Sequence, residues 1–163
     1  MKSYALLLSI GLVAGCDQVR EAAMAPGSGP APEAAPPRTL DPTPPPPPPA
    51  AARTVDEFDT TSAEDRAEAA AAPAPEEAAS ERRLGTTIAS LGSPTEPGFW
   101  LETPLVSEVT PGRVELSGGG RSANVELRPS GGSSGSGSQI SLAALRLLEV
   151  PLTDLPELTV YAD

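Results

Sequence analysis

The sequence RVELSGGGRSANVEL, residues 113–127, contains the clearest strand pattern of the chain. Apolar side chains alternate with polar ones at Val114 and Leu116, and again at Val125 and Leu127. Alternation with a period of two is typical of strands that bury one face, and the run of glycines between the two segments is suited to a turn. The sequence therefore predicts a β-hairpin that pairs residues 113–117 with residues 122–127.

The segments on either side of this hairpin extend the same prediction. Residues 86–91, 99–109 and 158–161 are rich in β-forming or apolar side chains and are expected to be strands, whereas residues 131–138 are a glycine and serine loop. Ser141 is a good N-cap for a short helix with Leu142, Leu145 and Leu148 on one face, and Pro151 ends it. Residues 84–163 are thus predicted to form a small β-rich domain with one short helix.

The predicted core of this domain consists of its regularly placed aliphatic side chains and its tryptophan. Its members are Ile88, Leu91, Trp100, Leu105, Val109, Val114, Leu116, Val125, Leu127, Ile140, Leu142, Leu145, Leu148, Leu152, Leu155, Leu158 and Val160. Trp100 has a second interpretation, because an exposed tryptophan can serve as a stacking platform for a sugar. It is therefore a candidate glycan contact as well as a candidate core residue.

Residues 16–83 have a different composition, dominated by proline, alanine and acidic residues. Such a segment buries too little apolar surface to offset its ordering entropy, so we expect a disordered tether in which prolines 44–49 form polyproline II. Two short helical patterns, which begin at Thr61 and Pro75, lack a wide apolar face and are expected to be transient, solvated helices. The alternative is a segment that folds on a partner.

The N-terminus carries a pattern for export and lipidation. Lys2 precedes an apolar segment, residues 4–13, that is too short to span a bilayer and has the length of a signal peptide. The sequence LVAGC, residues 12–16, resembles the lipobox of bacterial lipoproteins. That resemblance implies removal of residues 1–15 and acylation of Cys16, for example with palmitate. We therefore expect a lipid anchor in the cell membrane or outer membrane, with the protein facing the periplasm of the cell envelope.

Charge and residue types exclude several functions. The net charge is −11, with 22 acidic against 11 basic residues and no histidine. Nucleic acids require a positive surface, so they are not expected as partners. A single cysteine and no histidine also exclude Ser-His-Asp and Cys-His catalysis, and the carboxylates lack the spacing of metal ligands. We expect no cofactor and no metal.

Residues 120–122, 125–127 and 140–145, which read GRS, VEL and ISLAAL, resemble the double-psi β-barrel of rare lipoprotein A type. Members of that family that cleave glycans carry an acidic residue in an NDRGP motif after the second strand, and they use a histidine. The corresponding positions here, residues 127–131, read LRPSG. The resemblance thus implies a double-psi β-barrel-like scaffold whose catalytic residues are missing.

Together these patterns predict a lipid-anchored envelope protein that binds peptidoglycan or an envelope protein without catalysis. One alternative is a degenerate glycan-cleaving enzyme of lytic transglycosylase type, and another is a lipoprotein whose tether makes the protein contacts. The chain is also similar to short lipoproteins described as sugar-acid (galactarate) dehydratases. Its residues do not support that activity, which requires a metal site.

Overall fold

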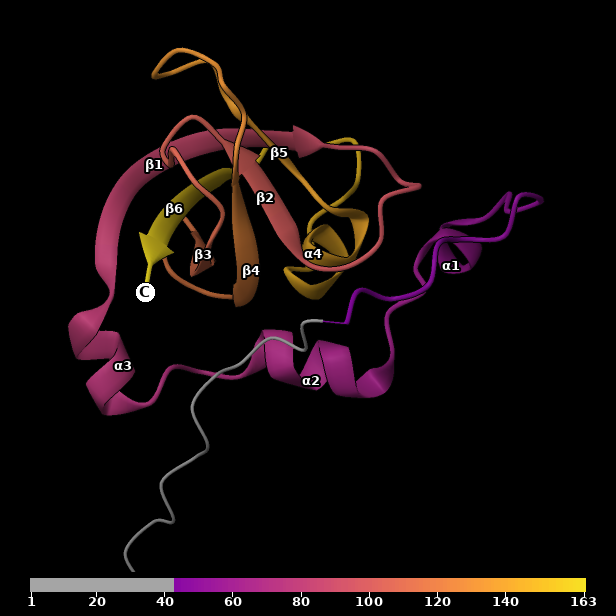
Figure 1. Cartoon of the computed structure of the whole chain (residues 1–163), viewed down its shortest axis with the longest axis horizontal. Coiled ribbons are helices and arrows are strands. Elements are labelled where there is room, and N and C mark those ends of the chain that lie inside the picture. Colours follow the sequence, from indigo (N-terminus) through magenta and orange to yellow (C-terminus); the bar gives the residue numbers. More distant parts are fainter. Residues whose placement is uncertain (1–42) are drawn as a thin grey trace, which may run out of the picture. The chain divides into compact units, whose positions relative to one another are not determined.

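The computed structural model describes residues 43–163, and these contain six strands and four short helices (Figure 1). The strands are β1 (Arg82–Leu91), β2 (Trp100–Thr103), β3 (Thr110–Leu116), β4 (Ser122–Pro129), β5 (Ser138–Ile140) and β6 (Glu157–Ala162). The helices are α1 (Val55–Phe58), α2 (Ala63–Ala70), α3 (Pro75–Ser80) and α4 (Leu142–Leu147). In this part of the chain, no helix is long and apolar enough to cross a membrane.

The six strands form a closed barrel in the order β1-β5-β2-β4-β3-β6. The pairs β1–β5 and β2–β4 are parallel, and the other neighbours are antiparallel. Closure satisfies the hydrogen-bonding groups along every strand and leaves no sheet edge. The prediction of a small β-rich domain is confirmed, and its architecture is a closed barrel.

The predicted hairpin is present as β3 and β4. Val114 lies opposite Ala123, and Gly112 lies opposite Val125. The turn glycines 118–120 all have positive φ, a conformation that glycine adopts without steric cost. Residues 123–125 of β4 are all buried, because Ala123 and Val125 face the core and Asn124 lies beneath helix α2. The hairpin therefore forms one wall of the core.

The core fills the inside of the barrel and extends under α4. Most predicted members are buried, and Leu91, Leu105, Leu116 and Leu152 are partly buried against them. Three were predicted wrongly, because Ile88, Val109 and Leu155 are 48%, 59% and 64% exposed. In β1 the fully buried side chain is that of Ala89, so its neighbour Ile88 faces outward. Val109 and Leu155 lie in connections just before β3 and β6.

The predicted helix near the C-terminus is α4, and its cap also joins it to the barrel. The Ser141 hydroxyl accepts hydrogen bonds from the backbone N–H of Ala144 at 3.3 Å and of Trp100 at 3.2 Å. One side chain therefore caps the helix and holds it against the start of β2. The strand β5 was missed, because its three residues are too few to show a periodic pattern.

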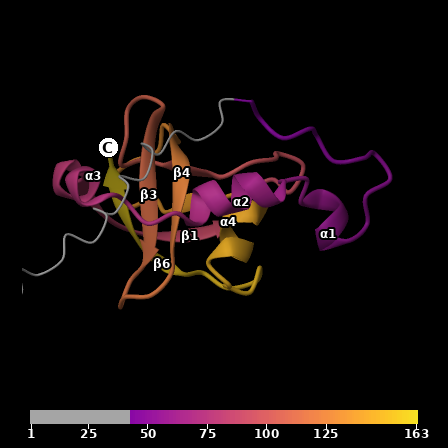
Figure 2. The same ribbon diagram turned by 90° about the horizontal axis from the view of Figure 1, so that it is seen from below.

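Residues 43–81, called the strap below, are folded onto the barrel, so the expectation of a disordered tether does not hold for them. Helix α2 lies over β4, as Figure 2 shows, and buries Ala69 to 1% exposure. The amide nitrogen of Asn124 in β4 donates to the carbonyl oxygens of Glu68 and Ala71 at 3.0 and 3.1 Å. The strap is held by these contacts with backbone groups, which hydrophobic periodicity does not reveal.

Ion pairs hold the two ends of the strap. Arg146 of α4 binds the carboxylates of Asp56 and Asp59 at 2.7 and 2.9 Å, and the Asp59 side chain is 2% exposed. At the other end, Arg113 of β3 binds Glu81 at 2.8 Å. The strap is thus anchored on both sides of α2. The predicted signal peptide, Cys16 and residues 16–42 of the predicted tether lie outside the described residues.

The proline run also contacts the folded part. Pro45 and Pro48 are half-buried whereas the prolines between and beside them are exposed, which matches the three-residue period of polyproline II. The Thr60 hydroxyl donates to the Pro46 carbonyl oxygen at 2.6 Å. The run therefore rests on the protein along one of its faces.

Candidate functional site

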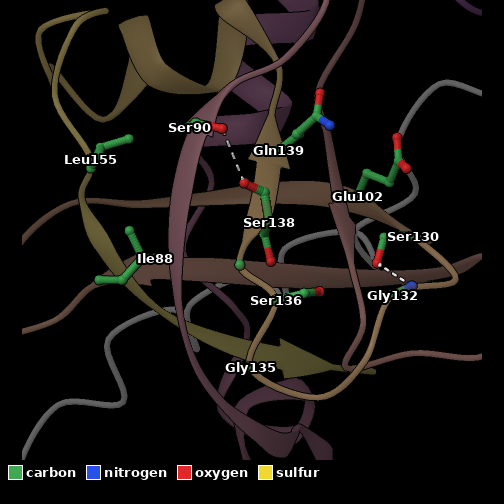
Figure 3. A pocket seen from close by; sticks show the side chains of 11 residues that line it. Ile88, Ser90, Glu102, Ser130, Gly132, Gly135, Ser136, Ser138, Gln139 and Leu155 are labelled. Carbon is green, nitrogen blue, oxygen red and sulfur yellow. Dashed lines mark hydrogen bonds between the residues drawn. The ribbon is translucent and has the colours of Figure 1, made fainter.

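A groove of about 570 Å³ opens on the side of the barrel formed by β1, β5 and β2. The loop between β4 and β5, residues 130–137, forms one end of it, and the connection before β6 contributes Leu155 (Figure 3). The volume lies within the usual range for ligand sites in proteins. Four separate segments of the chain meet here, so this groove is the candidate site.

One wall of the groove is aliphatic. Ile88 of β1 and Leu155 lie on the same side of it, as Figure 3 shows. Their exposed fractions, 48% and 64%, are large for aliphatic side chains. Exposed apolar groups that gather at a concavity indicate a contact surface for a ligand. These two residues, which the sequence assigned to the core, instead face the groove.

The facing wall is polar. Glu102 of β2 lies directly opposite Gln139 of β5 in the antiparallel register, and both side chains line the groove. Ser130 lies on the same side as Glu102 (Figure 3). A carboxylate, an amide and a hydroxyl together provide both donors and acceptors of hydrogen bonds. The groove is therefore amphipathic across its width.

A chain of buried hydroxyl groups lies beneath the groove. The Ser138 hydroxyl donates to Thr103 at 2.9 Å, and Thr87 lies 2.8 Å from Ser138 on the other side. These bonds link β1, β5 and β2, the strands that form the floor. They use the Ser138 hydroxyl for structure, which leaves it unsuited to act as a nucleophile.

The charge in the groove is that of one carboxylate. The groove is lined by no arginine or lysine, and the Glu102 carboxylate has no ion pair within residues 43–163. By contrast, Arg128 binds both Glu126 and Glu96 outside the groove, and Arg121 binds Glu149 at 2.5 Å. The negative charge of Glu102 thus stands alone in a concave surface.

These groups are suited to binding more than to catalysis. Hydrolysis of a glycosidic bond commonly uses two positioned carboxyl groups, and the groove holds Glu102 alone. Among the described residues, no group of three acidic, histidine or cysteine side chains could hold a metal ion. The arrangement can form hydrogen bonds, contact apolar surface and attract a positive charge.

Trp100 is not part of this groove. Its side chain is 2% exposed, and its ring nitrogen donates to the Glu96 carbonyl oxygen at 3.3 Å. The Arg128 guanidinium lies 5.3 Å from the ring centroid, a distance that permits a cation–π contact. The interpretation of Trp100 as an exposed sugar platform is therefore wrong, and the core interpretation holds. Cys16, the other predicted site residue, lies outside the described part of the chain.

The groove residues have no distinctive pattern in the sequence. Ile88 and Leu155 fitted an apolar pattern, and Glu102 fitted the polar face of a strand. Of the LRPSG segment that replaces the acidic family motif, Ser130 reaches the groove. The chain matches no protein-family model, no curated protein and no solved structure.

Proposed function

We propose that this protein is a lipid-anchored cell-envelope protein whose barrel binds peptidoglycan in the groove without cleaving it. The proposal rests on one observation: an aliphatic wall, formed by Ile88 and Leu155, faces a polar wall, formed by Glu102 and Gln139. Peptidoglycan presents apolar sugar and side-chain surfaces next to hydroxyl and amide groups. A groove with both kinds of wall is complementary to such a polymer.

The sequence supports the location. The LVAGC lipobox pattern favours acylation at Cys16 and a position on the periplasmic side of the cell membrane or outer membrane. The closed barrel, with its GRS turn and ISLAAL helix start, favours a double-psi β-barrel of the rare lipoprotein A type. Both features agree with an envelope protein that works on the cell wall.

The placement of the strap supports the proposal as well. The strap contacts β4 and β3, with α2 over β4 in Figure 2, whereas the groove opens over β1, β5 and β2 and is lined by no residue of the strap. In the barrel order, β5 lies three strands away from β3. The chain that leads to the anchor therefore joins the barrel away from the groove.

Two other functions have some support. Glu102 could serve as the single acid of a glycan-cleaving enzyme, since a carboxyl group in a groove is the minimum for general acid catalysis. Binding of an envelope protein, through the groove or through the tether, is the other candidate. The absence of a second acid in the groove favours binding of peptidoglycan over its cleavage.

Cosedimentation of the detergent-solubilised full chain with purified peptidoglycan tests the proposal. The informative variant is the double substitution Ile88→Glu with Leu155→Glu, which places charges on the aliphatic wall. The control is Val109→Glu, because Val109 has a similar exposed fraction but lies outside the groove. We expect the double variant to bind peptidoglycan at least about tenfold more weakly, because it loses the apolar contact and adds negative charge to the groove. The control should bind as the unmodified protein does. Equal binding by all three proteins would refute the groove as the site.

A further inference from the structure

Within residues 43–163 the Glu102 carboxylate has no ion-pair partner, and this points to a more specific ligand. Elsewhere in residues 43–163, Arg113, Arg128 and Arg146 each contact two acidic side chains. The groove is lined by no arginine or lysine. Its lining brings Glu102 together with the aliphatic side chains of Ile88 and Leu155. A negative charge in a concave surface concentrates positively charged ligands there.

The two walls together indicate which kind of positively charged group fits the groove. Glu102 and Gln139 lie across the groove from Ile88 and Leu155 (Figure 3). An alkyl chain that ends in an ammonium group has the same division, with an apolar stem and a charged tip. Its stem would contact the aliphatic wall while its tip approaches the carboxylate, and Gln139 would bind a neighbouring peptide group.

We propose that the groove binds the peptide part of peptidoglycan through the free side-chain amine of its diamino acid. This inference rests on the proposed function and makes it more specific. A neutral sugar would leave the Glu102 charge without a partner, and an anionic ligand would be repelled by it. With the peptide as ligand, the amine would pair with Glu102, the alkyl stem would contact the aliphatic wall, and a peptide group would bind Gln139.

The direct test compares native peptidoglycan with peptidoglycan whose amines have been N-acetylated, each titrated with the full chain in detergent. For the unmodified protein, acetylation should weaken binding about tenfold, the effect expected of one charge-assisted contact that is partly open to solvent. Glu102→Gln should weaken binding to native peptidoglycan by a similar factor, and acetylation should weaken its binding much less than it weakens that of the unmodified protein. Glu102→Asp, which keeps the charge, should retain the dependence.

A matched control separates the site from general electrostatics. Acetylation makes peptidoglycan more negative, and this protein is itself acidic, so part of any loss could arise from charge repulsion alone. Glu108→Gln removes one negative charge at an exposed position outside the groove. This variant should respond to acetylation as the unmodified protein does. If Glu102→Gln and Glu108→Gln respond alike, the inference is overturned.

The remaining outcomes distinguish this inference from the proposed function. Strong binding that does not change on acetylation would overturn the amine as ligand and leave peptidoglycan binding in place. Failure of native peptidoglycan to bind would refute the proposed function itself. Binding of a soluble lysine peptide by a protein that does not bind peptidoglycan would overturn both and indicate a protein partner.

Discussion

The side-chain amide nitrogen of Asn124 lies 3.0 Å from the carbonyl oxygen of Glu68, 56 residues earlier in the chain. The same nitrogen also donates to Ala71, so one barrel side chain binds two carbonyl groups at the end of α2. Asn124 is 4% exposed, which places these bonds in the interior between helix and barrel. The strap is therefore part of the folded domain, and that domain begins well before residue 84.

Replacing this amide should release the strap. Asn124→Ala removes both hydrogen bonds that join the barrel to the end of α2, and we expect a loss of about 1–3 kcal/mol in the free energy of unfolding. Asn124→Asp should be at least as harmful, because it brings a carboxylate toward two carbonyl oxygens. Urea unfolding measures the loss, and hydrogen exchange should show reduced protection of α2.

The control is Glu64→Gln, an exposed substitution on the same helix that should change stability by less than about 0.5 kcal/mol. Unchanged α2 protection in Asn124→Ala would contradict the role of Asn124 in holding the strap.

The ion pair between Arg113 and Glu81 should be important for stability. Both side chains are nearly buried, 11% and 4% exposed, and the guanidinium lies 4.3 Å from the ring centroid of Tyr161. Arg113→Met removes the guanidinium that binds the buried Glu81 carboxylate, which should cost about 3 kcal/mol in the free energy of unfolding. The double variant Arg113→Met with Glu81→Leu should recover much of that loss. A double variant as unstable as the single one would refute this interpretation.

The pKa of Arg113 gives this pair a simple pH dependence. The hydrogen bonds that Arg113 donates to the Glu81 carboxylate raise the pKa of Arg113 further above its ordinary value. A raised pKa contributes stability that is fully present below the unfolded value and is lost only as pH rises through the folded one. Between pH 7 and 10 the stability difference between the unmodified protein and Arg113→Met should stay constant. A difference that shrinks over this range would contradict the assignment.

Close packing at Gly92 provides a test of the buried position of Trp100. A Cβ atom at Gly92 would lie 2.4 Å from the Cη2 atom of Trp100, so Gly92→Ala must displace the indole ring. Overpacking of this kind typically costs about 1–3 kcal/mol. Acrylamide should then quench the fluorescence of the single tryptophan more strongly than in the unmodified protein. If acrylamide already quenched the unmodified protein strongly, the indole ring would lie at the surface, and its buried position would be contradicted.

The groove should bind peptidoglycan without cutting it. Incubation of the full chain with glycan strands should release no soluble muropeptides above a buffer control, because Glu102 has no second carboxyl group beside it in the groove. Product analysis by chromatography checks this. Muropeptides that are released by the unmodified protein and absent with Glu102→Gln would identify Glu102 as a catalytic acid and refute the non-catalytic account.

The sequence predicted those parts of the fold that have a local pattern. Alternation around Val114 and Val125 indicated the β3–β4 hairpin, and Ser141 with its leucine face indicated α4, because each signal lies within a few consecutive residues. The strap could not be predicted in this way. Its docking depends on backbone carbonyl groups bound by Asn124 and on ion pairs to distant arginines, and neither leaves an apolar stripe in the sequence.

The candidate site was hidden for a related reason. The groove joins four segments, and the barrel closure that brings them together follows from pairings such as β1 with β5, which are distant in sequence. Composition marks Ile88 and Leu155 as apolar but does not show which face of the barrel they occupy. Ala89, a smaller residue, takes the inward position in β1, and Ile88 therefore faces the groove.

The most direct test of the account is an NMR titration of the isotopically labelled full chain with soluble peptidoglycan fragments. We predict that the backbone signals of Ser90, Glu102 and Gln139 shift in a saturable manner, whereas those of Ala69 and Asn124, at the strap contact, remain in place. Shifts confined to the strap with an unperturbed groove would contradict the claim that the barrel binds peptidoglycan between its aliphatic and polar walls.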